Sequence, residues 1–414
     1  MIRLFLISFL LIFSASSVEA KKKVTLKKRF KEAHLAIKNS SGQENIERIL
    51  IDSLSRPTTT KNSKAEGYHI CALLQNNLNE GLNMKAYLKQ NIDTLKLYQT
   101  ILKVYGYTLQ SDSVDEKKKF ENKNIRLRSL HRENLLGGGI YNLRKNNWEE
   151  AFKYFDMFLK THTTDLDSVL GRVSYWATVC GMNANSAEKV LKHVDQAVSL
   201  SKKEDRPALL EYKARSYIQL GDSVSWLKLI EESVDTYPGY NYFFLNLMDY
   251  YMRHGQIERG LLRTDSLLRT DADRAVYWFA LSMFALEQND YEKCISMSEE
   301  CLLREPNNID GLYNKGISLL NLALTETNAA KRRQYYRRAL EPMEKVRELS
   351  PDNIQRWGNP LYRIYLNLNM GGKFEEIDAL LDKIQKNDTQ SNSPVHVPNT
   401  GKEVGTTYKR LGSS

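Results

Sequence analysis

Apolar residues recur along most of this chain at intervals of three and four positions, the spacing that places them on one face of an α-helix. Residues 24–128 show this pattern, with breaks at the polar segment NSSGQ and near Pro57. The segments ICALLQNNL and LKLYQTILKVYGY predict two longer helices in the same region. The pattern therefore predicts an all-α fold.

From residue 207 onward, the sequence pattern also repeats with a period of 34 residues. In the window that begins at Ala275, the defining residues are Trp278 at position 4, Leu281 at 7, Ser282 at 8, Tyr291 at 17, Cys294 at 20, Cys301 at 27 and Pro306 at 32. Windows that begin at Pro207, Asn241 and Ile309 keep the register, with small residues at Ala214, Gly260 and Gly316. Four windows in register indicate repeated helical hairpins.

This pattern resembles the tetratricopeptide repeat (TPR) family, in which two antiparallel helices cross closely where their side chains are small. The Asn289-Asp290 turn would join the two helices, Pro306 would end the second, and we expect Trp278 to pack inside its repeat. The resemblance implies a right-handed superhelical solenoid of TPR-like hairpins.

The resemblance covers residues 132–386, with three irregular units. Residues 164–204 predict a unit with a longer segment between its helices, and the unit from Ile309 is stretched before its second helix. A last unit begins near Gly358. Residues 21–131 are either degenerate repeats or a helical cap, because a repeat array needs an end with a polar outer face. The polar residues 387–414 predict a disordered tail.

The first twenty residues predict a secretory signal peptide. Arg3 precedes an apolar run, and the small residues Val18 and Ala20 suit signal peptidase, so cleavage is expected after Ala20. The alternative is an uncleaved anchor, but the apolar run is short for a membrane span. We therefore expect a periplasmic or secreted protein, with no transmembrane segment after cleavage.

No residues are arranged as a catalytic or metal site requires. The seven histidines are scattered, and the four cysteines form no CxxC motif, so buried packing explains the cysteines better than zinc binding. We predict no enzymatic activity, no cofactor and no metal.

The resemblance implies a partner-binding groove on the concave side, lined by fixed positions of each first helix. Carried over position by position, the groove residues are Tyr242, Leu245, Met252, Phe279, Met283, Tyr313 and Ile317. Their methionine and aromatic content is typical of protein-binding surfaces, although inter-repeat core explains any single residue as well. We expect Phe279, Met283, Tyr313 and Ile317 to form one exposed patch.

A net charge of +10 is concentrated in basic segments. The candidate basic patch is Lys331, Arg332, Arg333, Arg337 and Arg338. Such a patch could meet an anionic glycan or lipid, and a solvated helix face is the plainer explanation. Nucleic acid is not expected as a partner of an exported protein.

The tripeptide pattern Asp, then Ser or Thr, then an apolar residue occurs six times, beginning at Asp52, Asp93, Asp112, Asp167, Asp222 and Asp265. It resembles an acceptor motif for periplasmic O-glycosylation, and helix capping explains it equally well. The hypothesis from sequence is a protein-binding scaffold of the bacterial cell envelope. The alternative is a recognition module for anionic glycan or lipid.

Overall fold

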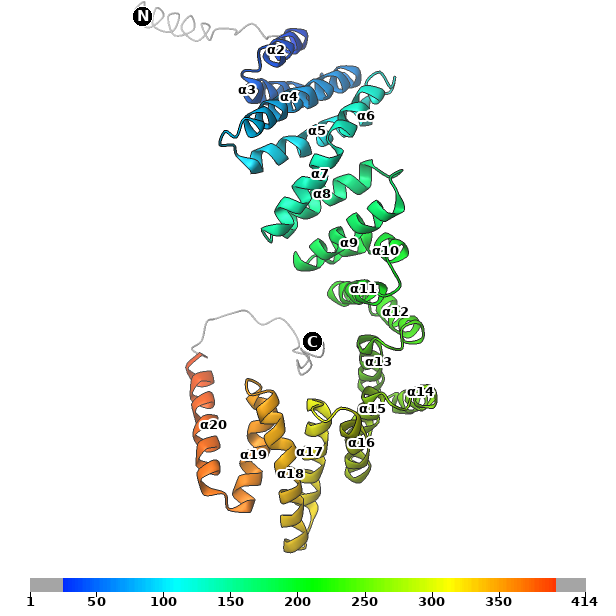
Figure 1. The fold of residues 1–414 in the computed structure, drawn as a ribbon, viewed down its shortest axis with the longest axis vertical. Coiled ribbons are helices and arrows are strands. Elements are labelled where there is room, and N and C mark those ends of the chain that lie inside the picture. The colour runs from blue at the N-terminus through cyan, green and yellow to red at the C-terminus, as the bar shows by residue number, and fades with distance from the viewer. Residues whose placement is uncertain (1–24, 392–414) are drawn as a thin grey trace, which may run out of the picture. The chain divides into compact units, whose positions relative to one another are not determined.

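The computed structural model describes residues 25–391, which form nineteen α-helices and no strand (Figure 1). The predicted all-α class is confirmed for these residues. The expected signal peptide, residues 1–20, lies outside them, as do residues 392–414 of the expected tail. The last helix extends to Ser391, so the first residues of that tail, 387–391, are helical.

The chain divides into two compact units between Gly221 and Asp222. The helices of the N-terminal unit are α2 (Leu26–Asn39), α3 (Gln43–Leu54), α4 (Lys61–Tyr87), α5 (Thr94–Val114), α6 (Glu121–Leu130), α7 (Arg132–Arg144), α8 (Trp148–Thr161), α9 (Asp167–Asn183), α10 (Ala187–Leu200) and α11 (Arg206–Leu220). Consecutive helices pack in pairs, among them α4 with α5, α7 with α8, and α9 with α10.

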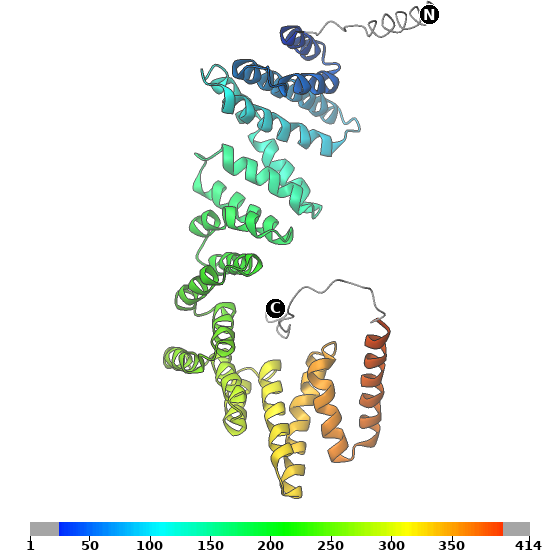
Figure 2. The ribbon, with the colours of Figure 1, turned by 180° about the vertical axis from the view of Figure 1, so that it is seen from behind.

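The C-terminal unit continues the paired arrangement. Its helices are α12 (Ser223–Thr236), α13 (Asn241–Arg253), α14 (Ile257–Thr270), α15 (Ala275–Glu287), α16 (Tyr291–Arg304), α17 (Ile309–Thr325), α18 (Ala329–Leu349), α19 (Ile354–Leu368) and α20 (Gly371–Ser391). The last four stand as a row of neighbouring helices in both views (Figures 1 and 2).

The helix boundaries confirm the predicted period. The first helices α13, α15 and α17 begin at Asn241, Ala275 and Ile309, and these residues are 34 positions apart. The turns repeat in the same register, because Gly255 and Asn289 both have positive φ angles, +67° and +59°. Glycine and asparagine tolerate this left-handed backbone at a helix end. The backbone therefore repeats with the same 34-residue period as the sequence.

Small residues allow neighbouring helices to approach, within a hairpin as predicted and also between successive hairpins. Gly260 of α14 faces the Phe284 ring of α15, and Gly316 of α17 faces Met343 of α18; an added Cβ atom would overlap either side chain. Gly139 meets Phe155 in the same way in the N-terminal unit. A ring or thioether from one helix thus fills the space that the missing side chain leaves on the other.

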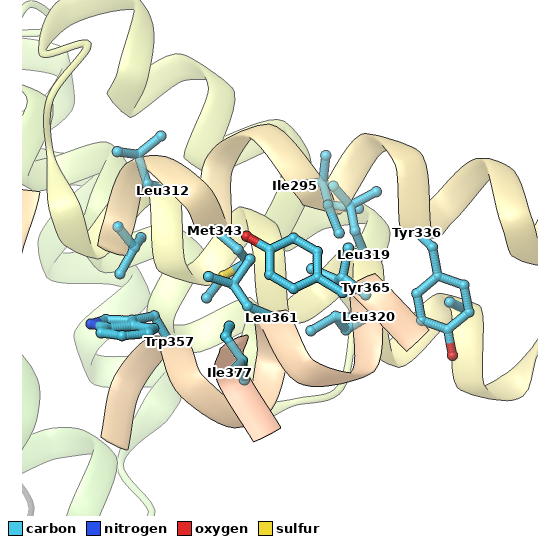
Figure 3. Packing of buried hydrophobic residues seen from close by; sticks show 14 residues of the cluster. Ile295, Leu312, Leu319, Leu320, Tyr336, Met343, Trp357, Leu361, Tyr365 and Ile377 are labelled. Atoms are coloured by element: carbon cyan, nitrogen blue, oxygen red, sulfur yellow. The ribbon is translucent and has the colours of Figure 1, made fainter. Parts of the chain in front are cut away.

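The largest core of the C-terminal unit lies among α17, α18, α19 and α20 (Figure 3). Trp357 and Tyr365 of α19 are buried there with Met343 of α18 and Ile377 of α20. The Trp357 Nε1–H donates to the Ser350 carbonyl oxygen at 3.0 Å, so the indole keeps a hydrogen bond inside the core. The last four helices therefore share one core.

Two predictions about the irregular units are wrong in detail. In the unit at 164–204, the extra residues lengthen the first helix, α9, and the turn before α10 is short. The buried residues Val173, Ala177 and Cys180 continue one apolar face along α9, which stabilises the longer helix. In the unit from Ile309, the inserted residues extend α17 and α18 themselves, so the basic segment is helical.

Trp278 also differs from expectation, because it is half-buried at the edge of its repeat. Its Nε1–H donates to the Ala272 carbonyl oxygen at 2.9 Å, and Arg304 Nε donates to the same oxygen at 2.8 Å. The Arg304 guanidinium lies 4.7 Å from the Trp278 ring centroid. Trp278 and Arg304 therefore both bind the turn that precedes α15. We expect truncation of Trp278 to lower the free energy of unfolding by less than truncation of a core tryptophan would.

A buried carboxylate organises the start of the N-terminal unit. Glu47 of α3 is 5% exposed and accepts hydrogen bonds from Tyr107 Oη and Gln75 Nε2, both at 2.6 Å. Lys103 Nζ lies 3.3 Å from the same carboxylate. These donors come from α4 and α5 and compensate the cost of burying the charge. The long helices of this region are thus joined by polar as well as apolar contacts.

All four cysteines are buried and unpaired, as the sequence suggested. Burial raises the pKa of Cys180 and of Cys301 to about 12, and it raises the pKa of Cys71 and Cys294 as well. We therefore expect the native protein to resist thiol alkylation near pH 8, because almost no thiolate is present or accessible. Mass spectrometry should show modification only after denaturation, and rapid labelling of the folded protein would contradict the burial.

The glycine contacts predict a difference between two substitutions. Gly260→Ala should destabilise the protein by about 1–3 kcal/mol, since the new methyl group overlaps the Phe284 ring. Gly106→Ala is the matched control, because Gly106 also lies inside a helix but has open space at its Cβ position. The control should be neutral or stabilising by up to about 1 kcal/mol. Urea unfolding measures both, and equal effects would contradict the close packing.

Candidate functional site

The first helices of the C-terminal unit lie next to one another, with α13 against α15 and α15 against α17. We call the half-buried groove candidates that they carry the first-helix surface: Tyr242, Leu245, Met252, Met283, Tyr313 and Ile317. The buried amide of Asn314 donates to Ser282 Oγ at 3.0 Å and so joins α17 to α15 beneath this surface. The predicted side-by-side arrangement of α15 and α17 is confirmed.

Phe279 is the exception among the predicted groove residues. Its side chain is 8% exposed, so the expectation that it forms part of an exposed patch is wrong. Helix α15 is apolar on nearly every face and contacts α13, α14, α16 and α17, and a helix of that kind is buried all round. Met283, one turn further on, remains partly accessible.

Tyr313 is held by a charged neighbour from the next repeat. The Arg356 guanidinium of α19 lies 4.5 Å from the Tyr313 ring centroid and forms an ion pair with Asp310. The cation therefore covers one face of the ring and fixes its position. This contact makes Tyr313 a less mobile part of the surface than Met283 or Ile317.

A pocket of about 410 Å³ lies between α12 and α13, and the groove positions carried over from the repeat pattern did not predict it. Its lining residues are Ser223, Val224, Trp226, Leu227, Lys228, Glu231, Tyr250 and His254. The Trp226 and Tyr250 ring centroids are 5.7 Å apart, and His254 stacks on Tyr250 at 4.0 Å. The buried Trp226 Nε1–H has no hydrogen-bond partner in the structure. The pocket thus has an aromatic wall.

A departure from the repeat pattern could have revealed this pocket. Trp226 occupies position 20 of the window that begins at Pro207, where the next two windows have Gly260 and Cys294. In those two windows position 20 faces the first helix of the following hairpin, because Gly260 meets the Phe284 ring of α15 and Cys294 Sγ lies 3.7 Å from the Asn314 carbonyl oxygen of α17. Trp226 instead places a large ring between α12 and α13, beside Tyr250.

The predicted basic patch lies on the first three turns of α18. Lys331, Arg332, Arg333, Arg337 and Arg338 are all exposed. None of the five forms an ion pair with any residue that the structure describes. They do not belong to the first-helix surface, because α18 is the second helix of its pair.

The Asp-Ser/Thr-apolar sites serve more than one structural purpose. The carboxylates of Asp93 and Asp222 accept from backbone N–H groups at the starts of α5 and α12, which supports the capping interpretation at these two sites. Ser53 is buried and donates to the Ile49 carbonyl oxygen. Ser113, Ser168, Ser223 and Ser266 are exposed, and the glycosylation hypothesis stays a prediction for them.

Membrane-spanning helices and metal clusters are absent from the residues that the structure describes. Within residues 25–391, no helix combines the length and the hydropathy that a membrane crossing requires. Among the same residues, no group of three His, Cys, Asp or Glu side chains is placed to hold a metal ion.

No protein-family model matches this chain, and neither does any curated protein. Solved structures of low identity do match. The C-terminal part of a TPR repeat-containing protein from Cytophaga hutchinsonii is 15% identical, with 58% of this chain and 91% of that chain covered and a TM-score of 0.40. A TPR repeats protein from Bacteroides fragilis is 16% identical, with 60% and 98% covered and a TM-score of 0.27.

YrrB, described as a TPR protein with an unusual peptide-binding site, is 15% identical, with 48% of this chain and 94% of that chain covered and a TM-score of 0.31. The fold assignment of this chain rests on its own helices, which repeat every 34 residues and pack through small residues. The chain is a helical-repeat protein of paired α-helices, and its repeats resemble the tetratricopeptide repeat.

Proposed function

We propose that this protein is a non-enzymatic interaction scaffold of the cell envelope and binds a peptide or helix of a partner protein on its first-helix surface. The observation that carries the proposal is the arrangement of α13, α15 and α17. These adjacent helices present Leu245, Met252, Met283 and Ile317 at partial exposure. Apolar side chains that remain partly accessible on neighbouring helices are typical of interaction sites.

The side chains of this surface suit an extended or helical ligand. Methionine is unbranched and polarizable, so Met252 and Met283 can adjust to the shape of a partner. Tyr313, held by Arg356, offers a fixed aromatic contact beside them. The pocket at Trp226 and Tyr250 lies on a different side of α13 from Leu245 and Met252, because Tyr250 is about 200° around the helix from Met252, and it is therefore not part of this surface.

Site-specific photo-crosslinking tests this assignment even while the partner is unidentified. A photoreactive amino acid at Met283 or Ile317 should form a covalent adduct with a partner protein in the producing cells. The same amino acid at Leu303 should form none, because Leu303 is 76% exposed but lies on the second helix α16. Gel shift and mass spectrometry of the adduct provide the measurement.

The control position makes the outcome decisive. Adducts from Leu303 alone would place the partner on the second helices and would refute the first-helix surface. A protein that gives no adduct from Met283 or Ile317, although thermal unfolding shows it to be folded, would also count against the proposal.

The envelope setting predicts a processed N-terminus. If the segment before Lys21 is a signal peptide, the protein recovered from an envelope fraction should begin at Lys21. Terminal sequencing by mass spectrometry checks this directly. An intact Met1 in the cytoplasmic fraction would remove the envelope setting but would leave the interaction surface untouched.

A further inference from the structure

The exposed basic residues of α18 surround its first three turns, and the proposed function does not use them. We call Lys331, Arg332, Arg333, Arg337 and Arg338 the α18 basic face. All five side chains are exposed, and none is paired with a carboxylate among the described residues. Elsewhere in the same unit, exposed cations commonly have such partners, as Arg263 has Asp235 and Lys373 has Glu344. No ion pair with a carboxylate among the described residues neutralises these five charges, so they remain available to an anionic ligand.

The position of this face in the helix increases its attraction for anions. The N-terminus of a helix carries partial positive charge, and cations there are normally unfavourable. Helix α18 nevertheless has no acidic residue in its first turn. Its N-cap is the neutral Asn328, whose Oδ1 accepts from Ala330 N at 2.9 Å and from Lys331 N at 3.1 Å. The helix dipole therefore adds to the positive charge of Lys331 and Arg332, the two cations of the first turn.

The neighbouring acids reduce this charge only in part. Glu326 accepts from the Asn328 backbone N–H at 2.8 Å and is held to the turn before the helix. Glu341 is exposed one turn after Arg337 and can offset one of the five cations. The turn between α17 and α18 extends past the end of α19 in both views, which leaves the first turns of α18 accessible (Figures 1 and 2).

The rest of the unit limits what kind of anion can approach. Residues 222–391 contain 26 Asp and Glu but only 21 Lys and Arg, and five of those cations are in the α18 basic face. A broad anionic surface, such as a lipid bilayer, would bring many of these acids within a Debye length of about 8–10 Å and be repelled. A short anionic segment that touches only α18 avoids that repulsion.

We propose that the α18 basic face binds a short acidic segment of a partner protein, rich in Asp and Glu. Four of the five cations are arginines, whose planar guanidinium groups bind carboxylates through two parallel hydrogen bonds. Arg333 and Arg337 lie about 6 Å apart along the helix. Alternate residues of an extended peptide are separated by about 6.6 Å, so two carboxylates can meet both arginines at once.

The test uses the mature full chain and a labelled ten-residue peptide with Glu at every second position. Fluorescence anisotropy near 150 mM salt should show binding, and the peptide with Gln in place of Glu should not bind. Arg333→Gln with Arg337→Gln should weaken binding about tenfold, because two charge-assisted contacts are lost. Both substitutions are at exposed positions, and a circular dichroism melt confirms that the variant is folded.

A matched pair of substitutions tests whether binding depends on the α18 basic face or only on the net charge of the protein. Arg269→Gln with Lys293→Gln removes two exposed cations from α14 and α16 and should change binding less than twofold. An equal loss in this control would overturn the proposal, as would equal binding of the Gln peptide. Binding of phosphatidylglycerol vesicles through Arg333 and Arg337, with no binding of the Glu peptide, would assign the face to lipid headgroups instead.

This inference shares with the proposed function only the premise that the partner is a protein. The two can fail separately, because the arginine variants leave the first-helix surface intact. Crosslinks from Met283 that persist in the Arg333→Gln, Arg337→Gln variant would leave the proposed function standing, whatever the outcome of the peptide titration.

Discussion

The close approach of two helices at a residue with almost no side chain is the contact on which the rest of this structure depends. At Gly260 and Gly316, the neighbouring Phe284 ring and Met343 side chain occupy the volume where a Cβ atom would stand. Helix axes can approach this closely only if one partner contributes little volume. Each hairpin thereby buries an apolar stripe on both helices, and stacking of hairpins extends the core along the chain.

The C-terminal unit shows the consequence of breaking that constraint. Trp226 stands where the register requires a small residue, and the aromatic pocket with Tyr250 and His254 lies at this point. The buried indole N–H without a partner indicates a site that is not optimised for stability. Departures from a repeat rule are therefore informative, because regular repeats already account for the packing elsewhere.

Charge and apolar contact are placed on different helices of the C-terminal unit. The first helices carry the methionine and aliphatic residues of the first-helix surface, whereas the α18 basic face belongs to a second helix. A partner that uses both would gain apolar burial from one contact and orientation from the other, because charged contacts favour specificity and association rate. The C-terminal unit thus carries partly accessible apolar side chains and exposed cations on different helices.

The sequence by itself determined the helical class, the 34-residue period, the turn at Asn289 and the small residues at the helix crossings. The class, the period and the turn depend on neighbours within one hairpin, which the local pattern specifies, and the small residues repeat with the same period. Tertiary structure alone decided that Phe279 is buried and that Trp278 packs against Arg304 at the edge of its repeat. It also decided that the inserted residues lengthen α9 and α18. Exposure on a first helix depends on the helices of adjacent repeats, and the pattern of a single repeat contains no information about how closely those helices pack.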